Sequence, residues 1–393
     1  MKMIVATTGL VPDRFDTLCA MRLTVALSGI VLSLVLQAQG HYAIGFADTL
    51  LFNDSLHYTA FAYDGPAPLI VQAWFPLDHD QASPPLTFGE LRAPELRPEL
   101  QRVYDELLLR MDSAFIEYNI RSTLDDEPID YTPYDALAIK DSLFAMPTAA
   151  HRTEFPIKLD RPVIVYHHGG QGYSDENVRM AEFFAGNGFV FLSCNFHWPL
   201  ERAQYGTPIT WSPDRMSIRE LLGLARGIGE GNKVFFIGHS WGAQIGWCNL
   251  HEPGLADAFV SLETTIEWKN DSAEVREKWP DVLDAITRHR YPMPVLMVAD
   301  TEDGPPFPMF KCVRAAIRYL DPKEPFDHES YTSASFMRLA GEGRFNVPDA
   351  DALRAQEAIY QALLEEMLAF FQEQMGIPVK RPVYPEGDPF MRE

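Results

Sequence analysis

The most constraining feature of this sequence is the segment 238–242 (GHSWG), which follows an apolar run at 234–237 and precedes a helix-compatible stretch. A serine raised on a sharp strand-to-helix turn needs residues without side chains two positions before and after it, because larger residues would clash across the turn. Gly238 and Gly242 meet that requirement. The motif alone is weak evidence, but its strand and helix are the context in which such a serine acts as a nucleophile. We therefore predict that Ser240 is a catalytic nucleophile.

A serine hydroxyl is a weak nucleophile at neutral pH, so Ser240 needs a general base, which is most often histidine. In chains with this motif the acid and then the histidine follow the nucleophile. His251 lies in the helix after the motif and is expected to point away from the turn, and His289 precedes a strand at the wrong end of the sheet. His328 follows the last predicted core strand with a loop around it. We expect His328 to be the base.

Two carboxylates could hold that histidine in one tautomer. Glu263 stands directly after the strand-like run 258–262, and Asp303 stands after the next strand, at the end of Asp-Thr-Glu-Asp. Either loop can reach the histidine in an open α/β sheet. Glu263 is preferred because it lies in a stretch with little other charge, and Asp303 is kept as the alternative acid.

Two backbone amides are needed to stabilise the oxyanion of a tetrahedral intermediate. One is expected from Trp241, directly after the nucleophile, and the other from Gly170, in the glycine-rich turn after the strand-like run 162–166. The neighbouring residues His167 and His168 face opposite ways on a strand end, so they cannot both bind one metal ion. No zinc-binding spacing such as H-E-x-x-H occurs, and neither a metal nor another cofactor is expected.

Apolar, strand-like runs alternate with helix-compatible segments from residue 162 onward. The strand-like runs are 162–166, 189–194, 234–237, 258–262 and 294–299. The helix-compatible segments are 175–185, 214–224, 275–288, 310–320 and 351–375. This order predicts an α/β fold with a mostly parallel central sheet and helices on both faces. Residues 56–75, around the turn Asp64-Gly65-Pro66, predict an N-terminal antiparallel hairpin at the edge of that sheet.

An insertion at 78–160 separates the hairpin from this alternating region. Val103, Leu107, Met111 and Phe115 recur every four residues, which predicts an amphipathic helix over 98–118, and a shorter helix is expected over 134–146. Apolar residues at this spacing usually form a buried packing surface. We prefer that interpretation to a mobile lid.

The first forty residues have the pattern of a secretory signal peptide. A basic start at Met21-Arg22 precedes a fourteen-residue apolar run, 23–36, that ends in small residues near Gly40 and is short for a membrane span. The residues before Met21 are suspected to come from a wrongly assigned start. We expect a secreted or periplasmic protein without a stable membrane anchor, with one domain at 41–375. The tail 376–393, rich in proline and charge, is expected to be loosely held.

Charge and cysteine usage exclude several classes of protein. The formal net charge of −22 repels phosphate backbones and anionic lipid headgroups, so nucleic acid is not an expected partner. The four cysteines, Cys19, Cys194, Cys248 and Cys312, do not form a disulfide framework. Cys194 and Cys248 are expected to be buried free thiols.

The segments described above resemble the α/β-hydrolase superfamily, within it the branch of platelet-activating-factor acetylhydrolases and dienelactone hydrolases. The resemblance covers about 44–76 and 160–375 and is carried by 70–76 (IVQAWFP), 163–170, 188–194, 238–242 and 260–263 (VSLE). It implies an α/β-hydrolase fold and a serine esterase. In the acetylhydrolases the acid follows the strand after the nucleophile, a match that falls on Glu263; in the related polyester-degrading cutinases it follows the next strand, which falls on Asp303. Glutamate replaces the acetylhydrolase aspartate, and the insertion has no clear counterpart.

The expected activity is therefore hydrolysis of carboxylic esters, with a small molecule or a lipid ester as substrate. The same set of residues would also serve a peptidase or amidase, because acyl transfer from esters and from amides uses the same groups. A catalytically inactive hydrolase fold that binds other molecules is the alternative outside enzymes.

Overall fold

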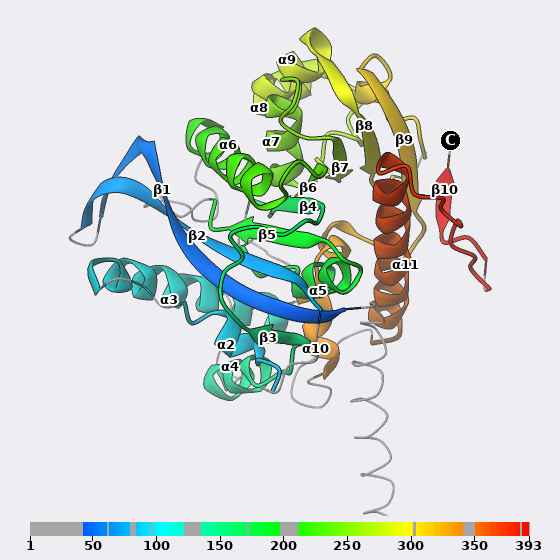
Figure 1. Cartoon of the computed structure of the whole chain (residues 1–393). Helices are drawn as coiled ribbons and strands as arrows, with labels where there is room; N and C mark the ends of the chain where they lie inside the picture. Colours follow the sequence, from blue (N-terminus) through cyan, green and yellow to red (C-terminus); the bar gives the residue numbers. More distant parts are fainter. Residues whose placement is uncertain are drawn as a thin grey trace, which may run out of the picture. The chain divides into compact units, whose positions relative to one another are not determined.

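The computed structural model contains a ten-stranded mixed sheet (Figure 1). The structure describes residues 42–60, 63–78, 84–94, 96, 98–121, 135–170, 173–196, 211–301, 304–340, 350–385 and 387–392, all within one compact unit. The predicted signal peptide and the acid candidate Asp303 lie outside them. The strands are β1 (Ala43–Ala60), β2 (Tyr63–Leu77), β3 (Ala150–Arg152), β4 (Val163–His167), β5 (Val190–Cys194), β6 (Val234–His239), β7 (Ala258–Leu262), β8 (Arg290–Val298), β9 (Arg314–Pro322) and β10 (Phe390–Arg392).

The middle of the sheet is parallel, as predicted. The strand order is β10-β9-β8-β7-β6-β4-β5-β2-β1-β3, and the six strands from β9 to β5 in that order run parallel. β2 joins β5 in antiparallel orientation and pairs along its length with β1, which confirms the N-terminal antiparallel hairpin. Parallel neighbours bring the carboxyl ends of β4, β6 and β7 to one edge, where the loops of interest begin.

The position of the hairpin turn differs from the prediction. Residues 64–66 belong to β2 and pair with 57–59 of β1, and the pairing of the two strands continues to Ala60 and Tyr63. Pro66 is tolerated in a strand here because β2 pairs with β5 over 71–74, whereas Pro66 lies outside that stretch and pairs with His57 of β1. Local turn preference therefore gave the correct motif and the wrong register.

Helices cover both faces of the sheet (Figure 1). Phe184 and Phe371, from α5 and α11, pack in one core, and Leu221 and Trp247, from α6 and α7, pack in the other. Strand residues alternate between the two cores, as the two-residue period of a strand requires. The helices are α2 (Phe88–Leu91), α3 (Pro98–Arg121), α4 (Ala136–Phe144), α5 (Val178–Gly186), α6 (Trp211–Ile228), α7 (Trp241–Asn249), α8 (Ser272–Lys278), α9 (Pro280–Arg288), α10 (Met337–Ala340) and α11 (Ala350–Gln374), with short 3-10 helices η1 (Pro308–Phe310), η2 (His328–Tyr331) and η3 (Ser333–Phe336).

The helix predicted over 310–320 is wrong, because residues 314–322 form strand β9. Alanine, arginine and leucine in this segment favour a helix locally. Pairing with β8 on one side and β10 on the other overrides that preference. The correction places a sheet strand six residues before His328, which supplies the final strand that the sequence did not reveal.

The insertion packs into the same core as α5 and α11. Phe88, Phe115 and Leu143 are buried there, which agrees with the packing interpretation for Phe115, whereas the side chains of 103, 107 and 111 lie outside the description. Arg92, 1% exposed, connects the insertion to the main domain through its ion pair with Asp175.

Two ion pairs surround this arginine. Its guanidinium donates to both carboxylate oxygens of Asp175 at 3.1 Å and to Asp112 of α3 at 3.0 Å, and Lys140 of α4 completes the cluster with a contact of 2.6 Å to Asp112. The rings of Phe88, Phe115, Phe144 and Tyr173 surround the guanidinium at 5.1–5.6 Å. A buried charge of this kind is stable only because it is paired on more than one side.

The tail after Gly376 is not loosely held, contrary to the expectation. Its last strand, β10, pairs with β9 in antiparallel orientation. Arg392 forms an ion pair of 3.0 Å with the buried Glu366 of α11, and Tyr384 donates to the same carboxylate at 2.9 Å. These long-range contacts give the proline-rich segment a fixed course that its composition does not indicate.

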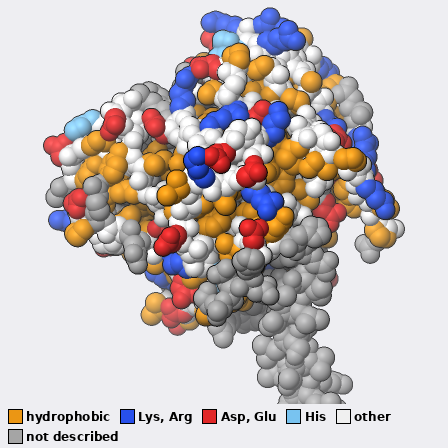
Figure 2. Space-filling view, in the orientation of Figure 1, with side chains coloured by type: hydrophobic (Ala, Val, Ile, Leu, Met, Phe, Trp, Pro, Cys, Tyr) orange, Lys and Arg blue, Asp and Glu red, His pale blue; other side chains and the backbone are white. Residues whose placement is uncertain are grey.

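The surface drawn in Figure 2 carries acidic and basic side chains close together, although the net charge is −22. On this face the negative charge of the chain is therefore not segregated into a field of one sign. Cys194 and Cys248 are buried and are not part of a disulfide, as predicted, and Cys312 is exposed.

Candidate active site

The turn around Ser240 has a strained backbone. Strand β6 ends at His239, helix α7 begins at Trp241, and Ser240 between them has φ 50° and ψ −113°. Positive φ is uncommon for a residue with a side chain and is tolerated where the surroundings enforce it. The Ser240 N–H donates to the carbonyl of Leu262 at 2.8 Å, and the Ser240 carbonyl accepts the first bond of α7 from Gln244 at 3.1 Å.

The two flanking glycines are required by close backbone contacts. A Cβ atom at Gly238 would lie 2.4 Å from the carbonyl oxygen of Gly242, and one at Gly242 would lie 2.2 Å from the carbonyl oxygen of His167. Both distances are far inside van der Waals contact, and the atoms met are backbone atoms that cannot move aside. The spacing read from the sequence thus has a direct steric cause.

His328 and Glu263 meet at this edge of the sheet. His328 begins η2, and its Nδ1 is hydrogen-bonded to Oε1 of the fully buried Glu263. A carboxylate accepts only, so Nδ1 carries the proton and Nε2 of the neutral ring is left with a lone pair. The rings of His328 and His239 lie 5.0 Å apart, which places His328 beside the residue that precedes Ser240.

The loop that carries His328 is held by a capping motif. The carboxylate of Asp327 accepts from the backbone N–H of Ser330 at 2.9 Å and from its hydroxyl at 2.6 Å. Gln356 of α11 donates to Asp327 at 2.9 Å and to the carbonyl of Pro325 at 2.6 Å. The polar loop after β9 is thereby held both by its own capping motif in η2 and by a side chain of α11.

Glu263 is presented by an unusual backbone. It has φ 43°, Thr265 has φ 66°, and the Glu263 N–H extends the sheet by donating to Val298 at 2.8 Å. Gln244 of α7 donates to the carbonyl of Thr264 at 2.6 Å. Residues with strained backbone angles cluster at functional sites, where neighbouring contacts hold them in that conformation. Here those contacts come from β8 and from α7, the helix that follows Ser240.

Burial and neighbouring charges act on His328 in opposite directions. Burial lowers the pKa of its imidazole, whereas the charge and hydrogen bond of Glu263, followed by the charges of Glu329 and Glu267, raise it, and the net pKa is about 9. Burial raises the pKa of Glu267 to about 7, against the hydrogen bonds that it accepts from Thr264. The carboxylates of this region therefore favour the imidazolium form of His328.

The two predicted amide donors, Gly170 and Trp241, are neighbours. A Cβ atom at Gly170 would lie 3.6 Å from Cβ of Trp241, an ordinary contact. The preceding N–H, that of Gly169, is directed 3.3 Å to Oε1 of Glu176. Crowding therefore does not require a glycine at position 170.

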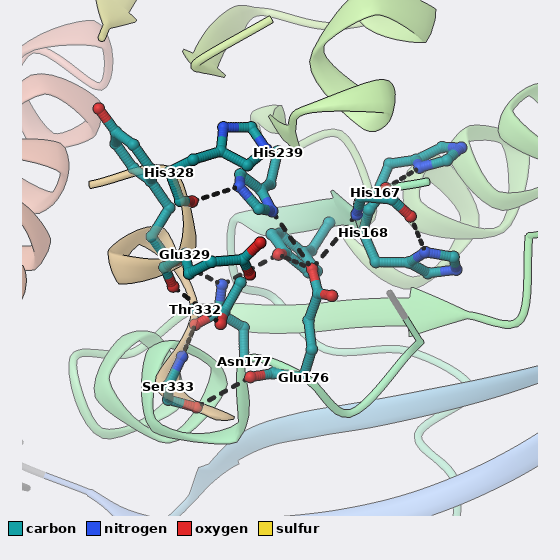
Figure 3. A network of polar contacts seen from close by, with 12 residues as sticks. His167, His168, Glu176, Asn177, His239, His328, Glu329, Thr332 and Ser333 are labelled. Carbon is teal, nitrogen blue, oxygen red and sulfur yellow. Dashed lines mark hydrogen bonds and ion pairs between the residues drawn. The ribbon is translucent and has the colours of Figure 1, made fainter. Parts of the chain in front are cut away.

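A second polar group near the site was missed at the level of sequence (Figure 3). Glu176, 5% exposed, lies after the glycine-rich turn, and His239, 4% exposed, occupies the variable position before Ser240. Nδ1 of His239 lies 3.7 Å from Oε1 of Glu176, and Nε2 lies 3.2 Å from the carbonyl oxygen of His328. The only signal in the sequence was a histidine next to the nucleophile, which gives no direction for its side chain.

The other two downstream histidines lie elsewhere. The rings of His251 and His289 stack with centroids 3.7 Å apart, and His289 directly precedes β8, at the end of the parallel strands opposite to Ser240. Within the part of the chain that the structure describes, no group of three or more His, Cys, Asp or Glu side chains could hold a metal ion. A search of the same residues finds no helix with the length and apolar character of a bilayer span.

Comparisons with known proteins connect this geometry to a fold. No family model matches the sequence, and no curated protein matches it. Among solved structures, a ferulic acid esterase from Streptomyces cinnamoneus is similar with a TM-score of 0.56 and 15% identity, covering 90% of this chain and 97% of its own. Esterase 2 of Thermogutta terrifontis (TM-score 0.37, 16% identity, 58% and 88% covered) and dienelactone hydrolase of Anabaena variabilis (0.35, 14%, 53% and 86%) also match.

The chain has the α/β-hydrolase fold. The similarity to the ferulic acid esterase spans nearly the whole of both chains, and the parallel sheet with its N-terminal antiparallel hairpin agrees with it. The predicted fold is thereby confirmed, whereas the branch of acetylhydrolases and the roles of individual residues stay predictions, because 15% identity supports the fold alone.

Proposed function

We propose that this chain is a serine hydrolase that cleaves carboxylic esters through an acyl-enzyme. Ser240 is the nucleophile, His328 the general base and then the general acid, and Glu263 the residue that orients the imidazole. The backbone N–H groups of Gly170 and Trp241 stabilise the oxyanion. No cofactor takes part.

The reaction follows from the proton positions. Nε2 of neutral His328 takes the proton of Ser240 Oγ as that oxygen attacks the ester carbonyl carbon, and the resulting imidazolium is stabilised by Glu263. The tetrahedral oxyanion is held by the two amides until the alcohol leaves with the proton from Nε2. A water molecule then attacks the acyl-enzyme in the same way, giving the acid and free Ser240.

One observation carries the proposal above all others: the hydrogen bond between His328 Nδ1 and the buried Glu263, beside a serine with φ 50°. A lone loop histidine would not bring a fully buried carboxylate with it, since the cost of burying that charge requires a partner. The fold adds support, because the structure that it matches over nearly its whole length is a ferulic acid esterase.

Secretion to the periplasm or the medium is part of the proposal and rests on the apolar run at 23–36. The natural substrate is proposed as a small-molecule or lipid ester. Amide hydrolysis by the same residues is the second outcome that the experiment below distinguishes.

The test is covalent labelling combined with hydrolysis assays. The intact protein should react with a fluorophosphonate probe and hydrolyse short p-nitrophenyl esters, and Ser240→Ala should lose both properties without a change in Tm. Fluorogenic aminoacyl amides, assayed in parallel, should be turned over more slowly than the esters. Unlabelled protein, or equal turnover of esters by Ser240→Ala, would exclude the proposed nucleophile.

A further inference from the structure

Glu176 is a hydrogen-bonding centre beneath the glycine-rich turn. Its carboxylate oxygen Oε1 accepts from the hydroxyl of Tyr166 and from the backbone N–H of Gly169 at 3.3 Å. Its carbonyl accepts from the N–H of Ala334 at 2.9 Å and from the hydroxyl of Ser333 at 3.1 Å. One residue thus contacts the end of β4, the turn after it and the segment that follows His328.

Asn177 extends the same connection. It donates to the hydroxyl of Tyr166 at 2.9 Å and to the carbonyl of Tyr331 at 3.0 Å, and its own oxygen accepts from Ser333 at 2.9 Å and Tyr360 at 2.7 Å. The turn that carries the proposed oxyanion donor and the segment that follows the proposed base are therefore joined through Glu176 and Asn177 (Figure 3).

His239 is the connection nearest to the reacting groups. A carbonyl oxygen only accepts, so the bond of 3.2 Å to His328 requires the proton on Nε2 of His239. Nδ1 faces Oε1 of Glu176 at 3.7 Å, which is longer than a hydrogen bond. The ring thus touches the backbone of the base on one side and the carboxylate that holds Gly169 on the other.

The position of His239 in the chain places its ring in contact with several parts of the proposed site. His239 is the last residue of β6, and its neighbour Ser240 has the strained φ of 50°. A Cβ atom at Gly169 would lie 3.3 Å from Nδ1 of His239, so the ring also limits how closely the turn can approach. Nucleophile, base and oxyanion turn all meet this one buried side chain or its backbone.

We propose that His239 is a positioning residue that sets the location of His328 and of the Gly169-Gly170 turn relative to Ser240. The inference rests on the proposed hydrolase function and adds to it a residue outside the three proposed catalytic side chains. His239 does not touch the reacting atoms. It acts through its Nε2–H bond to the carbonyl of His328 and, secondarily, through Glu176.

Three substitutions separate the two contacts. His239→Gln keeps an amide N–H near the place of Nε2, so it can still donate to His328. His239→Asn has its amide near the place of Nδ1 and faces Glu176, but it is too short to reach His328. His239→Leu removes both contacts at similar side-chain volume. It measures the loss of both contacts if the Gln or Asn side chain forms hydrogen bonds other than those expected.

We expect kcat for p-nitrophenyl acetate to fall by about tenfold or more in His239→Leu and His239→Asn, because displacement of a catalytic group by a fraction of an ångström has effects of this size. KM should change little, since no substrate contact is lost. His239→Gln should recover most of kcat. Thermal unfolding of each variant shows whether the fold is intact, and the comparison of Gln with Asn stands even if the Leu variant does not fold.

The contribution of Glu176 is measured by a double-mutant cycle. Glu176→Gln and His239→Leu should lower kcat by amounts that do not add in the double variant, because both act on one connection. Simple additivity would remove the link to the oxyanion turn from the proposal.

Two results overturn the inference. One is wild-type kcat in a folded His239→Leu variant; the other is a pattern in which Asn, and not Gln, recovers activity. Failure of the hydrolase proposal looks different, because either the intact protein would then stay unlabelled by the fluorophosphonate, or Ser240→Ala would keep its activity and its labelling. If Ser240→Ala is inactive and His239→Leu has wild-type kcat, only the proposed role of His239 is rejected.

Discussion

The carboxylate of Glu263 accepts the Nδ1–H of His328 across a separation of 65 residues, and the glutamate that does so is fully buried with φ 43°. The strand register explains how the two meet. Leu262 pairs with His239 on one side and with Val298 on the other, so the residue after it emerges at the same edge as Ser240. The pairing fixes which nitrogen of His328 faces the carboxylate and leaves the lone pair of Nε2 for its proposed role as general base.

The raised pKa of His328 predicts alkaline activity. Burial lowers this pKa but Glu263 raises it more, to about 9, and only the neutral imidazole can accept the proton of Ser240. The value of kcat/KM should therefore rise about tenfold per pH unit through the neutral range and level off near pH 9. The measurement is hydrolysis of a p-nitrophenyl ester across this range, with Ser240→Ala as the blank for spontaneous hydrolysis. A plateau already reached at neutral pH would contradict the assignment.

Loss of the acid should both slow the reaction and move its pH profile. Glu263→Gln removes the charge that raises the pKa of His328, so the rising limb should shift to lower pH while kcat falls by roughly 10⁴-fold, the effect of a misoriented imidazole. Asp303→Asn, at the alternative acid position, is the matched control and should leave both nearly unchanged. The reverse pattern would assign the role to Asp303.

Substitution of the glycines around Ser240 should unfold the turn. Gly238→Ala and Gly242→Ala place a Cβ within 2.4 Å or 2.2 Å of backbone atoms, so we expect a loss of more than about 3 kcal/mol in the free energy of unfolding, or no folded protein. Gly223→Ala in α6 meets no atom within 4 Å and should stabilise the helix by about 0.5–1 kcal/mol. Urea unfolding of the three variants checks the order. Tolerance of alanine at 238 or 242 would be incompatible with this turn.

The buried carboxylate of Glu267 predicts a pH-dependent change in stability. Burial raises its pKa from 4.5 to about 7, so below 4.5 the folded and unfolded chains are both protonated. Between these pH values Glu267 is ionised in the unfolded chain and protonated in the folded chain, so stability falls as the pH rises. Above about pH 7 the resulting loss in the free energy of unfolding is constant. Glu267→Gln should thus be more stable than wild type at about pH 8, by on the order of 1–3 kcal/mol less the value of lost hydrogen bonds, and equal to it near pH 4.

The control for this prediction is Glu274→Gln on the surface of α8, whose carboxylate is paired with Lys269 and Lys278. Removing that charge should change stability little at either pH. Denaturant unfolding at the two pH values gives the comparison. A Glu267→Gln variant that is less stable than wild type at the higher pH would show that the hydrogen bonds to Thr264 outweigh the buried charge.

The sequence was sufficient for the parallel part of the fold, because β4, β5, β6 and β7 are short apolar runs whose local pattern agrees with their place in the sheet. It was also sufficient for the turn at Ser240, since the two glycines have a steric cause that acts within five residues. The preference for Glu263 over Asp303 came from neighbouring charge, and the hydrogen bond to His328 now supports it.

Where the structure depends on contacts between residues that are distant in the chain, the predictions from sequence were wrong or absent. Residues 314–322 form a strand because β8 and β10 flank them, and β10 itself comes from a segment whose composition suggests a loose end. Glu176 and His239 each look like ordinary polar residues until folding brings them within 3.7 Å of each other. No local pattern encodes that distance.

The ion pair between Arg92 and Asp175 ties the helical insertion to the residue adjacent to Glu176. A chimera that exchanged this insertion for that of another protein with this fold would leave the buried carboxylate of Asp175 without the guanidinium of Arg92. That carboxylate is next to Glu176, which accepts a hydrogen bond from the glycine-rich turn. The insertion and residues 173–177 therefore constitute one module for protein engineering, to be transplanted together or kept together.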